Sequence, residues 1–143
     1  MTDLNDKKIT ILYLDTNIFL DVVQNRINKQ GKDIATPAAK LLLEALACKY
    51  YIAISTWTLK QIYNQLKVEE INMLFSMIRK KIIPVNYDSL DIQNAKQISA
   101  TNFDDALHII LAEKLGVDFI VTRNIDDFLK IGSNIPIRRP EEL

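Results

Sequence analysis

The sequence predicts an α/β domain, a three-layer sandwich in which helices flank a mostly parallel central β-sheet. Two kinds of segment support this prediction. Some are short and apolar, which is typical of strands buried on both faces, and others have apolar residues at helical spacing; the two kinds alternate along the chain. Such alternation is typical of βα units. The chain has 143 residues, of which 48% are apolar, so we expect one domain over residues 1–143 with a self-sufficient core.

The composition narrows the class of protein. With 25% charged residues, three Gly and four Pro, the chain does not resemble disordered or collagen-like proteins. Its 18 basic residues are balanced by 18 acidic ones, so net charge alone does not provide nucleic-acid binding. The polar N-terminus and the lack of an apolar stretch of about 18 residues predict a cytoplasmic protein without a membrane segment.

The expected strands are apolar runs that end at polar or turn-forming residues. Pro84 places the third strand at a sheet edge or makes it end there. We expect strands at residues 9–14, 51–54, 82–85 and 117–121, and a last short strand at 135–137.

The expected helices follow from apolar spacing and from residues that begin or end helices. We expect Thr36 to cap the helix that Pro37 begins, and Gly116 to end another in the left-handed conformation. The helices are expected from about 17 to 23 and at 38–48, 56–66, 68–79, 88–99, 104–115 and 126–130, with a polar loop at 28–33.

Polar clusters directly follow two of these strands. Asp15 follows the first strand, and residues 122–127 follow the fourth. In a parallel sheet both ends project from the edge where α/β proteins bind ligands. If the two strands are neighbours, Asp15, Asn124 and one of Asp126 or Asp127 converge within metal-ligand reach.

Any metal in this chain must be held by oxygen ligands, because Cys48 and His108 are its only cysteine and histidine. Asp104 and Asp105, at the start of a helix, add two carboxylates, which suit Mg²⁺ or Mn²⁺. Each cluster also has a structural interpretation. The polar residues before the helices are candidate caps, Asp15 for one helix and Asn102 for another, and the remaining acids are favourable in a first helical turn.

Three segments, taken in order, resemble PIN domains. Their opening motif resembles residues 11–19, ILYLDTNIF, and their closing half resembles FDDALH at 103–108 with FIVTRNIDDF at 119–128. The spacing agrees from about residue 9 to 137, and three ordered matches are more specific than one. The resemblance implies a PIN-like fold and a Mg²⁺- or Mn²⁺-dependent ribonuclease, often the VapC-like toxin of a toxin–antitoxin pair, that leaves a 5′-phosphate and a 3′-hydroxyl.

The resemblance also assigns roles to residues. Asp15, Asp105 and Asp127 match the family's acidic metal ligands, and Asn124 matches a position that the family fills with Asp or Asn. We expect Asp15 and Asp105 to bind the metal, with Asp127 and Asn124 in outer or water-mediated ligation. Polar residues that orient these ligands in the family match Asn17 and Thr122.

One position departs from the family's pattern. The family usually has a Glu about six residues after the Ser that follows the second strand, and counting from Ser55 reaches Gln61. A glutamine offers a carbonyl oxygen but no charge, which predicts a weaker metal site. Two alternatives stay open: a PIN-fold module that binds RNA or a protein without catalysis, and a haloacid dehalogenase-type phosphatase. The phosphatase motif needs a second Asp where this chain has Asn17.

Further residues are candidates around the site. We expect Asp104 to orient the attacking water, and His108 and Arg123 to contact RNA phosphate, although a lone helical histidine is more often a packing residue. The helix at 68–79 is apolar around more of its surface than one buried face needs. It is either buried in the fold or an interface for a homodimer or an antitoxin protein.

Overall fold

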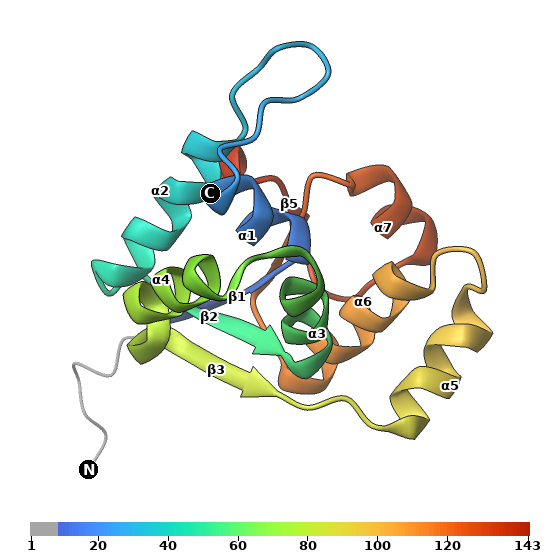
Figure 1. Ribbon diagram of the computed structural model, residues 1–143. Coiled ribbons are helices and arrows are strands. Elements are labelled where there is room, and N and C mark those ends of the chain that lie inside the picture. The colour runs from blue at the N-terminus through green and yellow to red at the C-terminus, as the bar shows by residue number, and fades with distance from the viewer. Residues whose placement is uncertain (1–8) are drawn as a thin grey trace.

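The computed structural model describes residues 9–143, in which five strands form one sheet between two layers of helices (Figure 1). Every neighbouring pair of strands is parallel, and the order across the sheet is β3-β2-β1-β4-β5. The strands are β1 (Thr10–Leu14), β2 (Tyr50–Ser55), β3 (Ile82–Val85), β4 (Phe119–Val121) and β5 (Ile137–Arg138). The predicted α/β sandwich is confirmed, and Pro84 lies on an edge strand as expected.

The helices lie close to their expected positions. They are α1 (Thr16–Val23), α2 (Ala35–Leu46), α3 (Thr56–Gln65), α4 (Val68–Ile78), α5 (Ser89–Ile98), α6 (Phe103–Leu115) and α7 (Ile125–Ile131), with short 3₁₀ turns η1 (Arg79–Lys81) and η2 (Pro140–Glu142). Gly116 ends α6 with φ of 77°, in the left-handed conformation that was predicted. Within residues 9–143, none of these helices has the length and apolarity needed to cross a membrane.

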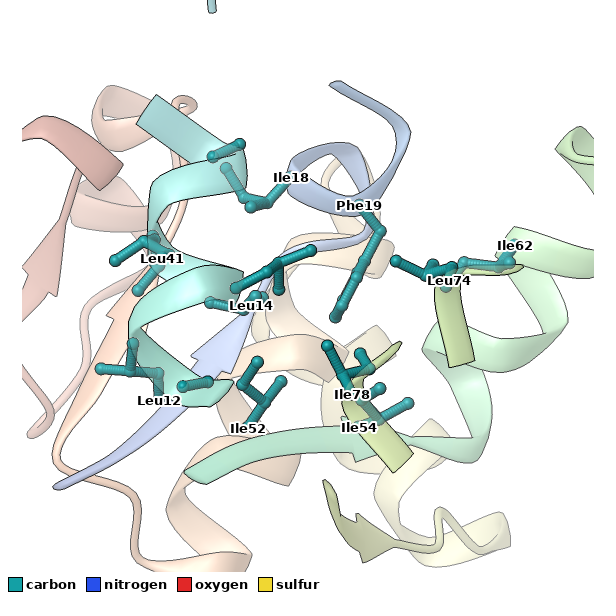
Figure 2. Packing of buried hydrophobic residues seen from close by; sticks show 14 of the residues in the cluster. Leu12, Leu14, Ile18, Phe19, Leu41, Ile52, Ile54, Ile62, Leu74 and Ile78 are labelled. Atoms are coloured by element: carbon teal, nitrogen blue, oxygen red, sulfur yellow. The ribbon is translucent and has the colours of Figure 1, made fainter. Parts of the chain in front are cut away.

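One face of the sheet is covered by α1, α2, α3 and α4. Leu12 and Leu14 of β1 point to this face, because alternate side chains of a strand share a side. There they pack with Phe19 of α1, Leu41 of α2 and Leu74 of α4 (Figure 2). Burial of each such side chain contributes about 1.5–3 kcal/mol, so this layer fixes α1 against the sheet directly after Asp15.

The opposite face is covered by α5, α6 and α7. Tyr13 of β1 and Ile120 of β4 point to it and belong to a second buried cluster. Leu107 of α6 and Phe128 of α7 complete this cluster, and both are fully buried. The first turns of α6 and α7 are therefore held over the same end of the sheet.

Two local predictions were wrong. Thr36 does not cap α2, because the helix begins at Ala35 and the backbone amides of Ala35 and Thr36 both donate to Oδ1 of Asp33. The fourth strand begins at Phe119 rather than at residue 117. Just before the strand, the amide of Ile11 donates to the side-chain Oδ2 of Asp118 at 2.8 Å, and the amide of Asp118 donates to the carbonyl of Ile11 at 2.9 Å.

Helix α4 is buried on one face and exposes apolar side chains on another. Ile71, Leu74 and Ile78 are buried in the core, whereas Met73 is 58% and Met77 is 43% exposed. An apolar cavity of about 350 Å³ lies between α3, α4 and the β3 edge. One face of α4 thus serves the fold, and apolar side chains stay at the surface.

Candidate functional site

The ends of β1 and β4 lie side by side at the carboxyl edge of the sheet, as predicted for neighbouring strands. The amide of Asp15 donates to the carbonyl of Val121 at 2.9 Å. The Thr122 hydroxyl donates to Oδ2 of Asp15 at 3.0 Å and accepts from the amide of Asn124 at 3.0 Å. Asp15 and Thr122 are both buried, so the Asp15 carboxylate is held in one orientation.

Asp105 reaches the same edge from the first turn of α6. Its Oδ2 accepts a hydrogen bond from Nδ2 of Asn124 at 2.9 Å. The pKa of Asp105 is raised to about 6, first by burial and then by the negative charge of neighbouring carboxylates. Those carboxylates, in decreasing order of effect, are Asp15, Asp127 and Asp104. The four acids therefore share one electrostatic environment.

Two polar cavities meet at the start of α6. The first, of about 140 Å³, is lined by Asp15, and the second, of about 250 Å³, by Asp127; Asp104 and Asp105 line both. The structure thus brings Asp105 together with each of the other two predicted ligands, but it does not bring Asp15 and Asp127 into one cavity. In the part of the chain that the structure describes, no group of three or more His, Cys, Asp or Glu side chains is arranged to hold a metal ion.

Helix capping does not explain the polar residues at this edge. Asp15, Asn102 and Asn124 each precede a helix, yet no side chain of the three makes a capping hydrogen bond. The interpretation of Asp15 and Asn102 as helix caps is therefore wrong. Asp126 and Asp127 do lie in the first turn of α7, where negative charge is favourable.

Gln61 and His108 line the smaller polar cavity and contact each other. Nε2 of His108 lies 3.1 Å from Oε1 of Gln61, and Nδ1 lies 2.7 Å from the Tyr13 hydroxyl. The Thr16 hydroxyl also donates to Oε1 of Gln61. Burial lowers the pKa of His108 against the opposing charge of nearby carboxylates, so its imidazole is neutral near pH 7.

A third cavity, of about 310 Å³, adjoins Asp15 on the side of α1. Asn17 lines it, and its Oδ1 accepts a hydrogen bond from Nη1 of Arg26 at 3.2 Å. Arg123 also lines it, but protein groups already hold its guanidinium. Nη2 of Arg123 lies 2.7 Å from Oε1 of Glu141 and 3.2 Å from the carbonyl of Ile34.

Arg123 also pairs with Asp21, which sequence reasoning missed. Nε of Arg123 lies 3.4 Å from Oδ2 of Asp21, and Asp21 is 2% exposed. Burial raises the pKa of Asp21, while Arg123 and Arg26 oppose the rise. Arg123, predicted to contact substrate, thus joins the end of β4 to α1 and to the C-terminal turn.

Three further polar contacts near the site were also missed. The Tyr13 hydroxyl lies 2.9 Å from Oγ of Ser55, which lies 3.0 Å from Oγ1 of Thr58. Nε1 of Trp57 donates to Oδ1 of Asp104 at 3.2 Å. One signal in the sequence pointed to the first of these contacts. Tyr13 lies in a strand expected to be covered on both faces, and a buried hydroxyl needs a hydrogen-bond partner.

At the level of sequence, no protein-family model and no curated protein matches the chain. Solved structures do match its fold. A chain of VapBC2 from Rickettsia felis, bound to a DNA fragment from its promoter, has a TM-score of 0.61 at 20% identity, over 91% of this chain and 98% of that chain. FitAcB from Neisseria gonorrhoeae gives 0.56 at 14% identity, over 92% of this chain and 99% of that chain. VapBC-1 from nontypeable Haemophilus influenzae gives 0.58 at 16% identity, with the same coverage of 92% and 99%.

These similarities extend over nearly the whole of each chain. Because the sequence identities are low, they show a shared fold only. The parallel sheet between two helical layers agrees with them. The chain therefore has the PIN-like fold that its three sequence segments resemble.

Proposed function

We propose that the chain is a Mg²⁺- or Mn²⁺-dependent endoribonuclease that hydrolyses phosphodiester bonds of single-stranded RNA. The observation that carries this proposal is the meeting of Asp15 and Asp105 at the carboxyl edge of the sheet. Each carboxylate is held by a polar neighbour, Asp15 by Thr122 and Asp105 by Asn124. The PIN-like fold supports the proposal, because such sheets bind ligands at this edge.

The donor set fits a hard divalent cation. Mg²⁺ is commonly bound through one or two carboxylates, with water and substrate phosphate in the remaining positions. Binding of this kind needs no ready-made group of three ligands, and it suits Asp15 and Asp105, with Asp127 and Asn124 acting through water. Burial first, and then the neighbouring carboxylates, raise the pKa of Asp105. A cation would offset both effects, which supports this assignment.

Asp15 and Asp105 would hold the cation, which would supply a lowered pKa of the attacking water and positive charge opposite the phosphate. The chain's own residues keep the ligands in place. Thr122 orients Asp15, and Asn124 orients Asp105. We assign the orientation of the water to Asp104, whose Oδ1 is itself fixed by the Trp57 indole.

Cation-dependent cleavage of RNA tests the proposal. We expect the purified chain to cleave labelled single-stranded RNA with Mn²⁺, to lose this activity with EDTA, and to bind Mn²⁺ in calorimetry. The alternative suggested by Gln61, a PIN-fold module without catalysis, predicts RNA or protein binding with no tight cation binding. A chain that binds RNA but neither binds Mn²⁺ nor cleaves would support that alternative.

We further propose that the chain is a toxin whose partner is an antitoxin protein. The VapBC and FitAB structures of the same fold are toxin–antitoxin complexes. Exposed Met73 and Met77 on α4 support a protein interface, formed with an antitoxin or with a second copy of the chain. Light scattering distinguishes a homodimer from a monomer of 16.4 kDa, and a strict monomer would exclude the homodimer.

A further inference from the structure

We propose that Arg26 binds a phosphate of the RNA backbone next to the scissile one, in the cavity that adjoins Asp15 on the side of α1. The inference deepens the proposed function and rests on it for the nature of the substrate. The cavity, of about 310 Å³, has Asp15, Arg26 and Arg123 among its lining residues. It therefore offers positive charge directly beside the proposed position of the scissile phosphate.

Arg123 is not free to make this contact, although it lines the same cavity. Its Nη1 donates to Oε2 of Glu141 at 3.1 Å. Its Nη2 lies 2.7 Å from Oε1 of Glu141 and donates to the carbonyl of Ile34 at 3.2 Å. Both terminal nitrogens of this guanidinium thus already have protein partners.

Arg26 is held with one terminal nitrogen free. Its backbone amide donates to the carbonyl of Asp21 at 3.1 Å, and its carbonyl accepts from the amide of Ile34 at 3.2 Å. Its side chain donates from Nε to Oε1 of Gln24 at 2.7 Å and from Nη1 to Oδ1 of Asn17 at 3.2 Å. Among residues 9–143, no group accepts a hydrogen bond from Nη2, so its two N–H groups remain for a ligand.

The Asp21 carboxylate also lines the cavity, and its charge is compensated within the protein. Its Oδ2 lies 3.4 Å from Nε of Arg123, and its Oδ1 lies 3.6 Å from Nη1 of Arg26. Asp21 is 2% exposed, whereas the Arg26 side chain is 32% exposed. A ligand that enters the cavity therefore meets the Arg26 guanidinium rather than the Asp21 carboxylate.

The chemistry of the cavity suits the RNA backbone rather than a base. None of the described residues that line it is aromatic, so a base finds no ring on which to stack. A guanidinium forms strong charge-assisted hydrogen bonds with phosphate oxygens. Because a phosphate contact carries no sequence information, we expect Arg26 to support the binding of different RNA sequences equally.

The loop that carries Arg26 extends this positive charge outward. Residues 24–34 include Arg26, Lys29 and Lys32 but only one acid, Asp33. The carboxylate of Asp33 accepts from the first amides of α2. In Figure 1 the loop stands out from the domain between α1 and α2, so its basic side chains continue from the cavity toward the solvent.

RNA binding in EDTA tests the inference, because removal of the cation prevents the proposed cleavage. Fluorescence anisotropy of a labelled single-stranded RNA measures the affinity at several salt concentrations. We expect Arg26→Gln to bind about tenfold more weakly than wild type at low salt. We expect the slope of log affinity against log salt to become shallower by about 0.7, the value for one phosphate contact with a single strand.

Arg79→Gln is the matched control for this experiment. It makes the same change of charge at an exposed residue directly before β3, at the amino edge of the sheet. We expect it to keep the affinity and the salt slope of wild type. Equal affinities of Arg26→Gln and Arg79→Gln for RNA would overturn the inference.

Arg26→Lys separates a contact with RNA from a structural role beside Asp21. It keeps a positive charge in the cavity, so we expect the salt slope of wild type. We expect its affinity to lie between those of wild type and Arg26→Gln, because an ammonium lacks the fork of the guanidinium. A salt slope as shallow as that expected for Arg26→Gln would contradict the inference. So would a lower Tm in Arg26→Gln with the wild-type affinity and salt slope.

Cleavage with Mn²⁺ separates the inference from the proposed function. We expect Arg26→Gln to raise KM about tenfold with kcat close to that of wild type, since the bound phosphate does not react. A wild type that binds RNA in EDTA but neither binds Mn²⁺ nor cleaves would refute the nuclease alone, and weaker binding by Arg26→Gln would still support the phosphate contact. A wild type that cleaves, with equal RNA binding by Arg26→Gln and Arg79→Gln, would overturn the inference alone.

Discussion

Polar residues precede helices at several strand ends, and they fall into two groups. Ser55 before α3 and Asp88 before α5 accept hydrogen bonds from backbone amides in the first turn of their helices. Asp15 and Asn124 occupy comparable positions before α1 and α7 but make no such capping bond. Their side chains instead contact Thr122 and Asp105 across the sheet edge. A residue suited to capping that does not cap is therefore informative about function.

The largest expected effect is at Asp15. Asp15→Asn keeps the shape of the side chain but removes the charge proposed to hold the cation, so we expect Mn²⁺-dependent RNA cleavage to fall at least about 100-fold. Asp88→Asn, which removes the charge of a capping carboxylate, should leave cleavage unchanged. Equal cleavage by wild type and Asp15→Asn would identify a contaminating nuclease.

Asn124 provides the next test of the difference between polar residues that cap helices and those that contact the acidic edge. Asn124→Ala removes the hydrogen bond to Oδ2 of Asp105, so we expect Mn²⁺ affinity measured by calorimetry to fall about tenfold. Asn94→Ala is the control, because Asn94 is exposed on α5. If the two variants bind Mn²⁺ equally well, Asn124 does not support the site.

The raised pKa of Asp105 predicts how the stability of the metal-free protein depends on pH. The folded protein takes up this proton near pH 6, and the unfolded chain takes it up near the usual value of 3.8. The folded state therefore binds more protons in this window, so the contribution of Asp105 to the free energy of unfolding rises as pH falls and is lowest near neutrality.

Thermal unfolding of wild type and Asp105→Asn at several pH values measures this contribution. Without metal, we expect Asp105→Asn to be the more stable protein at about pH 7, and the difference to shrink by about pH 5. Saturating Mn²⁺ should stabilise wild type more than the variant, because the cation binds the ionised carboxylate. A difference in Tm that does not change with pH would contradict the raised pKa.

The smallest expected effect concerns the helix ends alone. Asp88→Ala removes a capping box in which Asp88 and Asp91 bond each other's backbone amides, so we expect Tm to fall by a few degrees. Asn102→Ala removes no capping bond and should change Tm less. A larger loss in Asn102→Ala would show that Asn102 does stabilise α6.

Much of the fold was predictable because it depends on local patterns. Apolar runs and helical spacing placed the strands and helices within a few residues, and Gly116 ended α6 as expected. The errors were also local. Thr36 was predicted to cap α2, but the carboxylate of Asp33, in the loop before the helix, accepts from the first amides of α2 instead. Helix propensity does not decide between two nearby candidate caps.

The candidate site was predictable only in part. The rule for parallel strand ends predicted that Asp15, Asn124 and one of Asp126 or Asp127 converge. Asn124 instead donates a hydrogen bond to Asp105 at the start of α6, and Asp127 lines a different cavity from Asp15. The pairs Asp21 with Arg123 and Tyr13 with His108 could not be foreseen. Their members lie about a hundred residues apart in sequence and meet only through the packing of helices on both faces of the sheet.

The indole of Trp57 has a practical consequence. Trp57 is the chain's single tryptophan, and its N–H donates to Asp104, a carboxylate that lines both polar cavities. Its fluorescence therefore arises from one position beside the acidic edge of the sheet. We expect this fluorescence to change when Mn²⁺ is added, if the cation binds at the proposed site.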